Sequence, residues 1–229
     1  IVVRINYRLG PFGWFYHPSI QSLQNGIDKT SNFGTLDIIS ALKWVNQNIK
    51  FFGGDSENIT IFGESAGGHN VLSLLVSQKA NGLFHKAISM SGYTTTINQE
   101  KSYKQDKQSS TSDFSSWNVM NMILDDKNLP KIQEGFSKNE LRDILLTLST
   151  EDFFKHFSNR EPYQELPLLQ SDGIVIPKQG LRKALSNPKY IKDIPVIAGS
   201  TKDEVKLWLA SARYFVDLDY SILGTVFRI

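Results

Sequence analysis

A Gly-rich turn between a strand-like run and a helix-like run constrains the fold of this chain more than any other feature. The run Ile59–Phe62 has the β-branched content of a strand, and the apolar pattern of His69–Ser77 is typical of a helix. Between them, Gly63–Gly67 reads GESAG and fits the pattern G-x-S-x-G. Roughly one chain in thirteen of this length would match by chance, so the pattern gains its weight from the strand and helix around it.

The chemistry of such a turn centres on Ser65. A tight strand-to-helix turn forces its serine into a strained backbone conformation, which is tolerable only if small residues flank it. We therefore expect Gly63 and Gly67 to make room for the turn, and the Ser65 hydroxyl to lie at the carboxyl end of a sheet as a nucleophile. The backbone N–H of Ala66, at the start of the helix, can then face a developing oxyanion.

The order of the other predicted elements indicates an α/β fold. Strand-like runs occur at Ile1–Tyr7, Ala87–Met90 and Pro195–Gly199, and the apolar spacing of Leu36–Ile49 is that of an amphipathic helix. Strands that alternate with helices favour right-handed βαβ units. We therefore predict a mostly parallel sheet with helices on both faces. Because the chain opens without Met inside a strand-like run, we expect this sheet to be incomplete at both ends.

The middle of the chain has a different character. The segment Tyr93–Ser116 is dominated by Thr, Gln, Lys, Ser and Asp, which predicts a solvated loop or insertion. Helices are expected within Trp117–Ser149 and again within Asp203–Arg213. Since neither an internal repeat nor a separating linker is visible, we interpret residues 1–229 as one partial domain that carries a variable insertion at 93–165.

Composition excludes several classes of function. Lys and Arg total 25 against 23 for Asp and Glu, a net charge of +2, so nothing in the charge favours nucleic acid or an anionic membrane. The longest apolar stretches, such as Val71–Val76, fall far short of the roughly 20 residues that span a bilayer. With no cysteine and four scattered histidines, metal catalysis is not expected. No signal peptide is visible, and localisation and oligomeric state stay open.

A serine nucleophile needs a histidine to take its proton and an acid to orient that histidine. In chains with this kind of turn, the acid follows a later strand and the histidine comes after the acid. Asp203 and Glu204 both follow the strand-like run Pro195–Gly199. Their spacing alone does not choose between them, and either carboxylate would also be favourable in the first turn of a helix.

No histidine follows either acid in the sequence. His69 lies about one helical turn after the serine, but the serine precedes the helix and points off the turn, so we interpret His69 as a polar residue on the helix surface. His17 and His85 fit structural or solvated positions, and His156 precedes the acid. We therefore expect the base to lie outside this chain.

Several blocks of sequence resemble the type-B carboxylesterase and cholinesterase family of the α/β-hydrolase fold. The resemblance covers Ile1–Gly92 and Leu166–Trp208 and is thin between them. Its blocks follow in the family's order: Asn6–Gly13, Asn32–Asp37, Ala41–Ile49, Phe52–Gly68, Leu83–Gly92, Asp172–Pro177 and Gly199–Glu204. Thr201 stands where the family usually has Asn, and Ile38 where it often has Gln. We expect neither difference to touch the chemistry directly.

The resemblance implies roles for individual residues. It makes Ser65 the nucleophile that forms an acyl-enzyme, Glu204 rather than Asp203 the acid, and Ala66 one donor of the oxyanion hole. Ser91 resembles a buried serine beside the acid. The implied activity is that of a serine carboxylic-ester hydrolase, without cofactor or metal, that acts on a small-molecule carboxylic ester.

The resemblance also implies missing parts. The family's oxyanion glycines precede the strand resembling Ile1–Tyr7, and its histidine follows the end of this chain. The family's sheet order leaves a gap between Ile1–Tyr7 and Ile59–Phe62, which would expose unpaired strand edges and apolar core. We therefore expect the isolated segment to fold poorly and not to hydrolyse esters. The alternatives are a binding or adhesion protein of the same fold and a truncated product without function.

Overall fold

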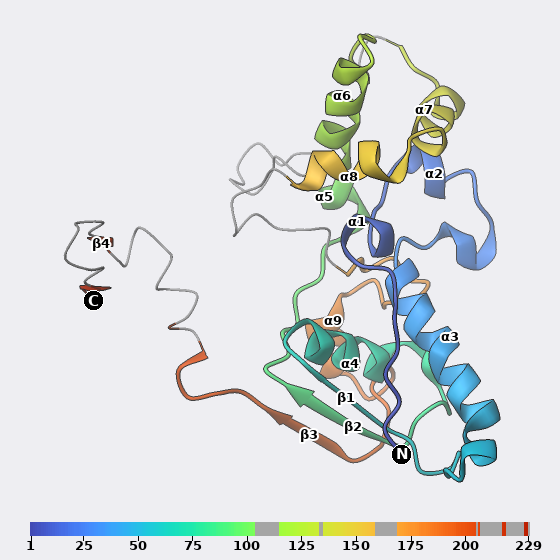
Figure 1. The fold of residues 1–229 in the computed structure, drawn as a ribbon, viewed down its shortest axis with the longest axis vertical. Coiled ribbons are helices and arrows are strands. Elements are labelled where there is room, and N and C mark those ends of the chain that lie inside the picture. The colour runs from blue at the N-terminus through green and yellow to red at the C-terminus, as the bar shows by residue number, and fades with distance from the viewer. Residues whose placement is uncertain are drawn as a thin grey trace.

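A three-stranded parallel sheet lies at the centre of the α/β part of the chain (Figure 1). The computed structural model describes residues 1–103, 115–132, 135–158, 169–204 and 206, with two further short strands. The strands β1 (Thr60–Glu64), β2 (Lys86–Met90) and β3 (Val196–Gly199) pair in that order. These three strands confirm the predicted strands at 59–62, 87–90 and 195–199 to within a residue or two. The short strands β4 (Asp217–Leu218) and β5 (Phe227–Arg228) pair antiparallel to each other.

Helices account for most of the other regular structure. The predicted helix at 36–49 is α3, and the helix after the serine turn is α4. The α-helices are α1 (Gly10–Gly13), α2 (Pro18–Gln21), α3 (Phe33–Asn48), α4 (Ala66–Val76), α5 (Gln99–Tyr103), α6 (Ser116–Asp126), α7 (Lys138–Leu146), α8 (Thr150–Ser158) and α9 (Leu181–Leu185). Single 3₁₀ turns occur at Gly26–Lys29, Ile49–Phe52 and Gln78–Ala80.

The two faces of the sheet differ in burial. On one face, Ile61 and Ala87 are buried beneath α4, which contacts both β1 and β2. On the other face, Phe62, Ile88 and Ile197 lie side by side in the register of the parallel strands. Phe62 is 59% exposed and Ile197 is 67% exposed, so the described residues leave this second face uncovered. The α/β class is confirmed, with α4 packed on the first face.

The apolar side chains form two separate cores. The larger one joins α3, α4 and α9 to the sheet, and the smaller one lies among α6, α7 and α8. Figure 1 shows these two groups of elements at opposite ends of the molecule. Contacts between them include α2, which packs against α7, and Phe12 of α1, whose ring lies 5.6 Å from that of Phe153 on α8.

The segment Ile1–Tyr7 is not a strand, contrary to the sequence prediction. A strand needs a neighbour to accept and donate its backbone hydrogen bonds, and among the described residues β1 pairs with β2 alone. Ile1 and Val2 are exposed accordingly. The β-branched residues of this run favour a strand, but no strand among the described residues pairs with it.

An ion pair fastens this N-terminal segment to α3. The Arg8 guanidinium donates from Nε and Nη2 to the two carboxylate oxygens of Asp37, each at 2.8 Å, and the Arg8 backbone N–H donates to the same carboxylate at 2.9 Å. This hydrogen bonding holds the pKa of Asp37 below its usual value and raises that of Arg8. Bidentate geometry makes such a pair directional as well as attractive.

The segment between Tyr93 and residue 165 is mixed. Its described part contains α5, α6, α7 and α8, which confirms helices within 117–149, whereas residues 104–114, 133–134 and 159–165 lie outside the described residues. The predicted helix beyond residue 206 lies outside them too. The division into one partial domain with an insertion stays a prediction.

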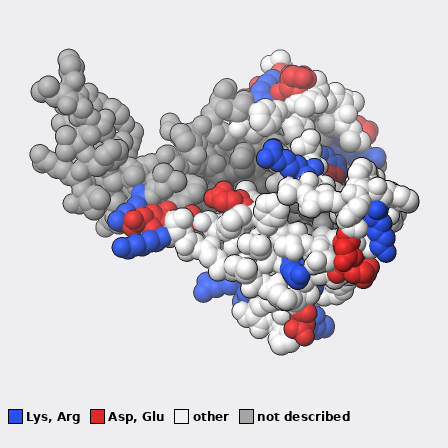
Figure 2. All heavy atoms as spheres, turned by 60° about the horizontal axis from the view of Figure 1, so that its bottom comes forward, with Lys and Arg blue, Asp and Glu red and all other residues white. Residues whose placement is uncertain are grey.

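Charged residues are dispersed over the surface. On the face shown in Figure 2, acidic and basic side chains lie close together with uncharged areas between them. Among the described residues, no helix is long and apolar enough to cross a membrane. The same residues contain no group of three or more His, Asp or Glu side chains placed to hold a metal ion.

The uncovered face of the sheet leads to a first prediction. Expressed alone, the 229-residue chain should bind the dye 1-anilinonaphthalene-8-sulfonate and self-associate. The reason is that an exposed apolar sheet face binds apolar dyes and other copies of the chain. The double change Phe62→Thr and Ile197→Thr should lower both the dye fluorescence and the sedimentation coefficient. Leu146→Thr, at an exposed position on α7, is the matched control and should change neither. A wild-type chain that stays monomeric and does not increase the fluorescence of the dye would contradict this prediction.

Candidate active site

Ser65 occupies the turn between β1 and α4 in a left-handed backbone conformation. Its φ is 53° and its ψ is −113°, values that are costly for any residue with a Cβ atom. Its backbone N–H donates to the carbonyl of Met90 at 2.9 Å, and its carbonyl accepts from the N–H of His69 at 2.9 Å. The strained turn is thus held from both sides, by the end of β2 and by the first turn of α4.

Glycine is required on the strand side of this turn for a steric reason. A Cβ atom on Gly63 would collide with the backbone of Gly67, including a contact of 2.5 Å to its carbonyl oxygen. A Cβ on Gly67 would meet nothing within 4 Å. The expectation that both glycines make room for the turn therefore holds for Gly63. Gly67 provides the backbone that lies against Gly63, and a Cβ atom on Gly67 itself would fit.

A second close approach joins α4 to the segment after β2. A Cβ on Gly68 would lie 2.7 Å from the Met90 carbonyl oxygen and 2.9 Å from the Cα of Gly92. A Cβ on Gly92 would strike the Ser89 hydroxyl, which donates to the Gly68 carbonyl at 3.1 Å. These contacts bring the amino end of α4 against the carboxyl end of β2.

Ala66 is the first residue of α4. The first N–H groups of a helix have no acceptor within the helix, and the helix dipole makes this end favourable for negative charge. The Ser65 side chain makes no capping bond to these N–H groups. The N–H of Ala66 therefore lies next to the serine in a position suited to binding an oxyanion.

Glu204 follows β3 and is fixed by three hydrogen bonds to one carboxylate oxygen. Oε2 accepts from the Ser91 hydroxyl at 2.6 Å, the Thr201 hydroxyl at 3.0 Å and the Thr201 backbone N–H at 3.1 Å. The Ser91 hydroxyl, followed by the two Thr201 donors, lowers the pKa of Glu204 below its usual value. No donor among the described residues reaches the second oxygen, Oε1.

The two candidate acids, Asp203 and Glu204, differ in their contacts. Glu204 is tied to Ser91, while the neighbouring Asp203 forms an exposed ion pair with Lys206 at 2.9 Å. Ser91 itself has a φ of 49°, and its N–H donates to the Gly199 carbonyl at the end of β3 at 2.7 Å. Ser91 lies beside Glu204, and its side chain is partly buried rather than buried.

Thr201, which stands where the family usually has Asn, contacts a candidate site residue. Both its N–H and its hydroxyl donate to the Glu204 carboxylate. The signal was present in the sequence as T-x-x-E at 201–204, the capping-box pattern in which a glutamate reaches back to the residue before a helix. The expectation that this position does not touch the chemistry directly stays a prediction. Ile38, the other unusual position, is buried in the larger core.

The consecutive residues Met90 and Ser91 bring both candidate residues to one edge of the sheet. Ser65 is bonded to Met90 through its backbone, and Glu204 is bonded to Ser91 through its carboxylate. Since β1, β2 and β3 are parallel and adjacent, their carboxyl ends meet there. The nucleophile and acid expected from the sequence are thus neighbours on this edge, 139 positions apart in the printed sequence.

His69 is buried, which makes the interpretation as a surface residue wrong. Only 4% of it is exposed, its Nε2 lies 2.8 Å from the Thr95 carbonyl, and its ring packs on that of Tyr93 with centroids 4.1 Å apart. Burial lowers the pKa of His69 to about 4, so the ring is neutral near pH 7. The prediction failed because sequence spacing does not reveal that the Tyr93 ring and the Thr95 carbonyl pack against His69.

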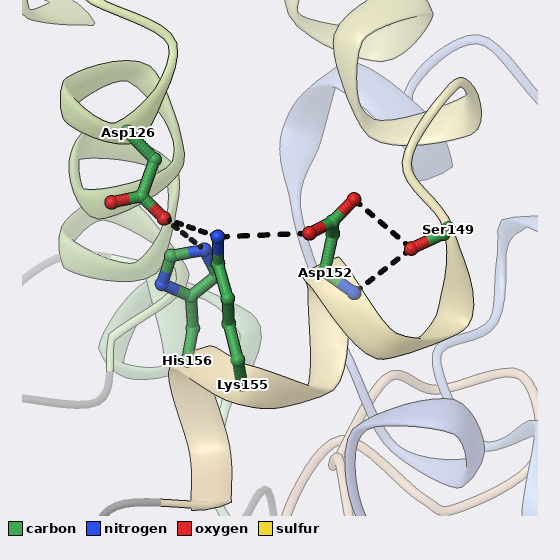
Figure 3. Close-up of polar contacts among 5 residues, drawn as sticks. All are labelled: Asp126, Ser149, Asp152, Lys155 and His156. Atoms are coloured by element: carbon green, nitrogen blue, oxygen red, sulfur yellow. Dashed lines mark hydrogen bonds and ion pairs between the residues drawn. The ribbon is translucent and has the colours of Figure 1, made fainter.

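The other histidines are engaged away from this edge. His17 accepts the Ser19 N–H at the start of α2, and burial lowers its pKa to about 4. His85 accepts the Ile59 N–H at the opposite, amino end of β1 and β2. His156 on α8 lies 3.4 Å from Asp126 on α6, in a polar group that also includes Lys155 (Figure 3). None of these contacts reaches the serine or the glutamate.

A serine held in a strained strand-to-helix turn beside an acid on a parallel sheet edge defines a site of the α/β-hydrolase type. The sequence profile of the carboxylesterase family matches residues 1–218. The chain therefore belongs to the carboxylesterase family and has the α/β-hydrolase fold.

Individual relatives agree with this assignment. The chain is 35% identical over 212 residues to a para-nitrobenzyl esterase of Bacillus subtilis, covering 89% of this chain and 37% of that protein. It is 35% identical to carboxylesterase 1E of Rattus norvegicus, covering 89% and 34% respectively. A solved PNB esterase matches with a TM-score of 0.68 at 30% identity, covering 93% of this chain and 40% of that one. The chain thus spans less than half the length of these relatives.

The steric difference between the two glycines of the turn leads to a second prediction. In the natural protein that carries this sequence, Gly63→Ala should lower the free energy of unfolding by about 3 kcal/mol, because its Cβ collides with backbone that cannot move aside. Gly67→Ala, the matched control in the same turn, should leave the melting temperature unchanged or raise it slightly, since alanine is the better helix former. Equal melting temperatures for the two variants would contradict the close approach.

Proposed function

We propose that the protein carrying this chain is a serine carboxylic-ester hydrolase in which Ser65 is the nucleophile and Glu204 the acid of the catalytic triad. The observation that carries the proposal is the convergence of Ser65, at φ 53°, and the fixed Glu204 carboxylate on Met90 and Ser91 at the end of β2. A binding protein has no physical need for a strained serine and an oriented carboxylate at the same sheet edge.

The reaction would proceed in two halves. Ser65 Oγ attacks the ester carbonyl carbon while its proton passes to a histidine imidazole, and the tetrahedral intermediate expels the alcohol, which takes that proton. Water then attacks the acyl-enzyme, its proton passing through the same imidazole to Ser65 Oγ as the carboxylic acid leaves. The N–H of Ala66 would donate to the oxyanion in both halves, together with donors from other parts of the whole protein.

Glu204 would orient the imidazole through Oε1. Oε2 is already occupied by the donors of Ser91 and Thr201, so Oε1 is the atom with capacity to accept an imidazole N–H. The depressed pKa keeps the carboxylate ionised, which stabilises the imidazolium formed during the reaction. Since the four histidines of this chain are engaged elsewhere, the imidazole would come from another part of the whole protein.

A covalent probe tests the role of Ser65. The natural protein should be labelled by a fluorophosphonate at Ser65, and Ser65→Ala should abolish labelling and lower kcat for an activated ester by at least about 1,000-fold. Ser186→Ala, an exposed serine after α9, is the control and should leave both unchanged. A folded natural protein that is not labelled at Ser65 would overturn the proposal and favour a binding or adhesion role.

The hydrogen bonds to Glu204 predict a change in the pH dependence of the reaction. Because the Ser91 hydroxyl lowers the pKa of Glu204, Ser91→Ala should raise that pKa, so the carboxylate should take up its proton nearer to neutral pH. The protonated acid cannot stabilise the imidazolium, so kcat/KM at pH 4 to 5 should be a smaller fraction of its value near pH 7 than in the wild type. Profiles of kcat/KM from pH 4 to 8 for the wild type and Ser91→Ala would measure this difference.

A matched change on the neighbouring residue controls that experiment. Asp203→Asn removes an exposed carboxylate that pairs with Lys206, and it should leave the acidic limb of the profile in place. If Asp203→Asn moved the limb and Ser91→Ala did not, Asp203 rather than Glu204 would be the acid.

A further inference from the structure

Lys192 places both its backbone N–H and its ammonium group on the carboxyl end of α4. The ammonium lies 2.8 Å from the Leu74 carbonyl oxygen, 2.7 Å from that of Ser77 and 3.5 Å from that of Leu75. The Lys192 backbone N–H donates to the Leu75 carbonyl at 3.0 Å. The three hydrogens of the ammonium thus face three carbonyls at the end of one helix.

A cation is favourable beside these carbonyls because they are buried and have no partner within the helix. The last carbonyls of a helix have no partner within the helix, and the end of α4 is buried, with Leu74, Leu75 and Ser77 all at most 2% exposed. The ammonium also lies 5.7 Å from the centre of the Phe84 ring. Burial lowers the pKa of Lys192 to about 8, which still leaves it charged near pH 7. A positive charge at this end complements the helix dipole.

The same lysine leads directly into the strand that carries the acid. Pro195, just before β3, accepts the Ala87 N–H at 3.1 Å, and Glu204 follows the other end of β3. Ser65 precedes the other end of α4. Lys192 therefore joins the two elements that carry the candidate nucleophile and acid, at the ends remote from the site.

The other contacts of α4 differ between its amino end and the rest of the helix. Val71, Leu74 and Leu75 bury apolar side chains in the larger core, and apolar burial is not directional. At the amino end, the Ser65 N–H donates to the Met90 carbonyl and the Ser89 hydroxyl donates to the Gly68 carbonyl. Lys192 adds directional hydrogen bonds at the carboxyl end, so that both ends of α4 are held.

We propose that Lys192 is a positioning residue for ester hydrolysis: by holding the carboxyl end of α4 to the chain entering β3, it fixes Ser65 relative to Glu204. This inference rests on the proposed function of these two residues. It predicts that loss of the ammonium lowers the rate of the chemical step in a protein that remains folded, because small misplacements of reacting groups are costly.

The test compares three variants of the natural protein with the wild type. Lys192→Met keeps the length of the side chain and removes its charge, and it should lower kcat about tenfold while KM changes less than about twofold. Lys192→Arg keeps a charged donor and should recover part of the lost kcat. Lys189→Met, at an exposed position in the same loop, is the matched control and should behave as the wild type. If Lys192→Met does not fold, Lys192→Gln replaces it.

Amide hydrogen exchange provides a readout that does not depend on activity. In Lys192→Met, exchange should become faster at residues 66–70, the amino end of α4, and not only at residues 74–77 beside the substitution. Exchange that changes at 74–77 alone, or an unchanged kcat in an active protein, would overturn the positioning role. If the wild type neither hydrolyses esters nor labels at Ser65, the proposed function fails, and exchange at 66–70 alone decides whether Lys192 fixes α4.

Discussion

The close approach of two backbone segments at the carboxyl end of β2 is the constraint on which the rest of the site depends. Gly63 and Gly68 allow the turn and α4 to lie against their neighbours without a Cβ between them, and the Ser65 N–H reaches the Met90 carbonyl at 2.9 Å. At the next residue, the Ser91 hydroxyl donates a hydrogen bond to the Glu204 carboxylate. A bulkier residue in this contact would move Ser65 and Glu204 together, because they are hydrogen-bonded to Met90, the last residue of β2, and to Ser91, the residue after it.

Helix α4 transmits this constraint through the molecule. Most of α4 from Gly68 onward is buried, so the carbonyls at its carboxyl end need partners that water cannot supply. At the carboxyl end the partner is the Lys192 ammonium, whereas at the amino end the N–H of Ala66 stays available beside the serine. The helix is therefore satisfied at the end remote from chemistry and left unsatisfied where an oxyanion would form.

Much of the α/β fold could be predicted from the sequence because its signals are local. The apolar spacing of α3, the runs that form β1 to β3 and the glycines of the turn each need only a short window of residues. The prediction failed for Ile1–Tyr7, where the residues favour a strand but the described residues supply no neighbouring strand. It failed again for His69, because the burial of a helix position depends on which distant segment packs over it, here Tyr93 and Thr95.

The sequence by itself determined that a serine would sit in a strained turn between a strand and a helix, since glycine spacing and β-branched content are properties of adjacent residues. It also narrowed the acid to Asp203 or Glu204, and its resemblance to the carboxylesterases favoured the second. Only the tertiary structure separated the two by contact, by bringing Ser91 to Glu204 and leaving Asp203 with Lys206. This difference in contacts depends on the pairing of β2 with β3, a contact between segments more than a hundred residues apart, which no local pattern encodes.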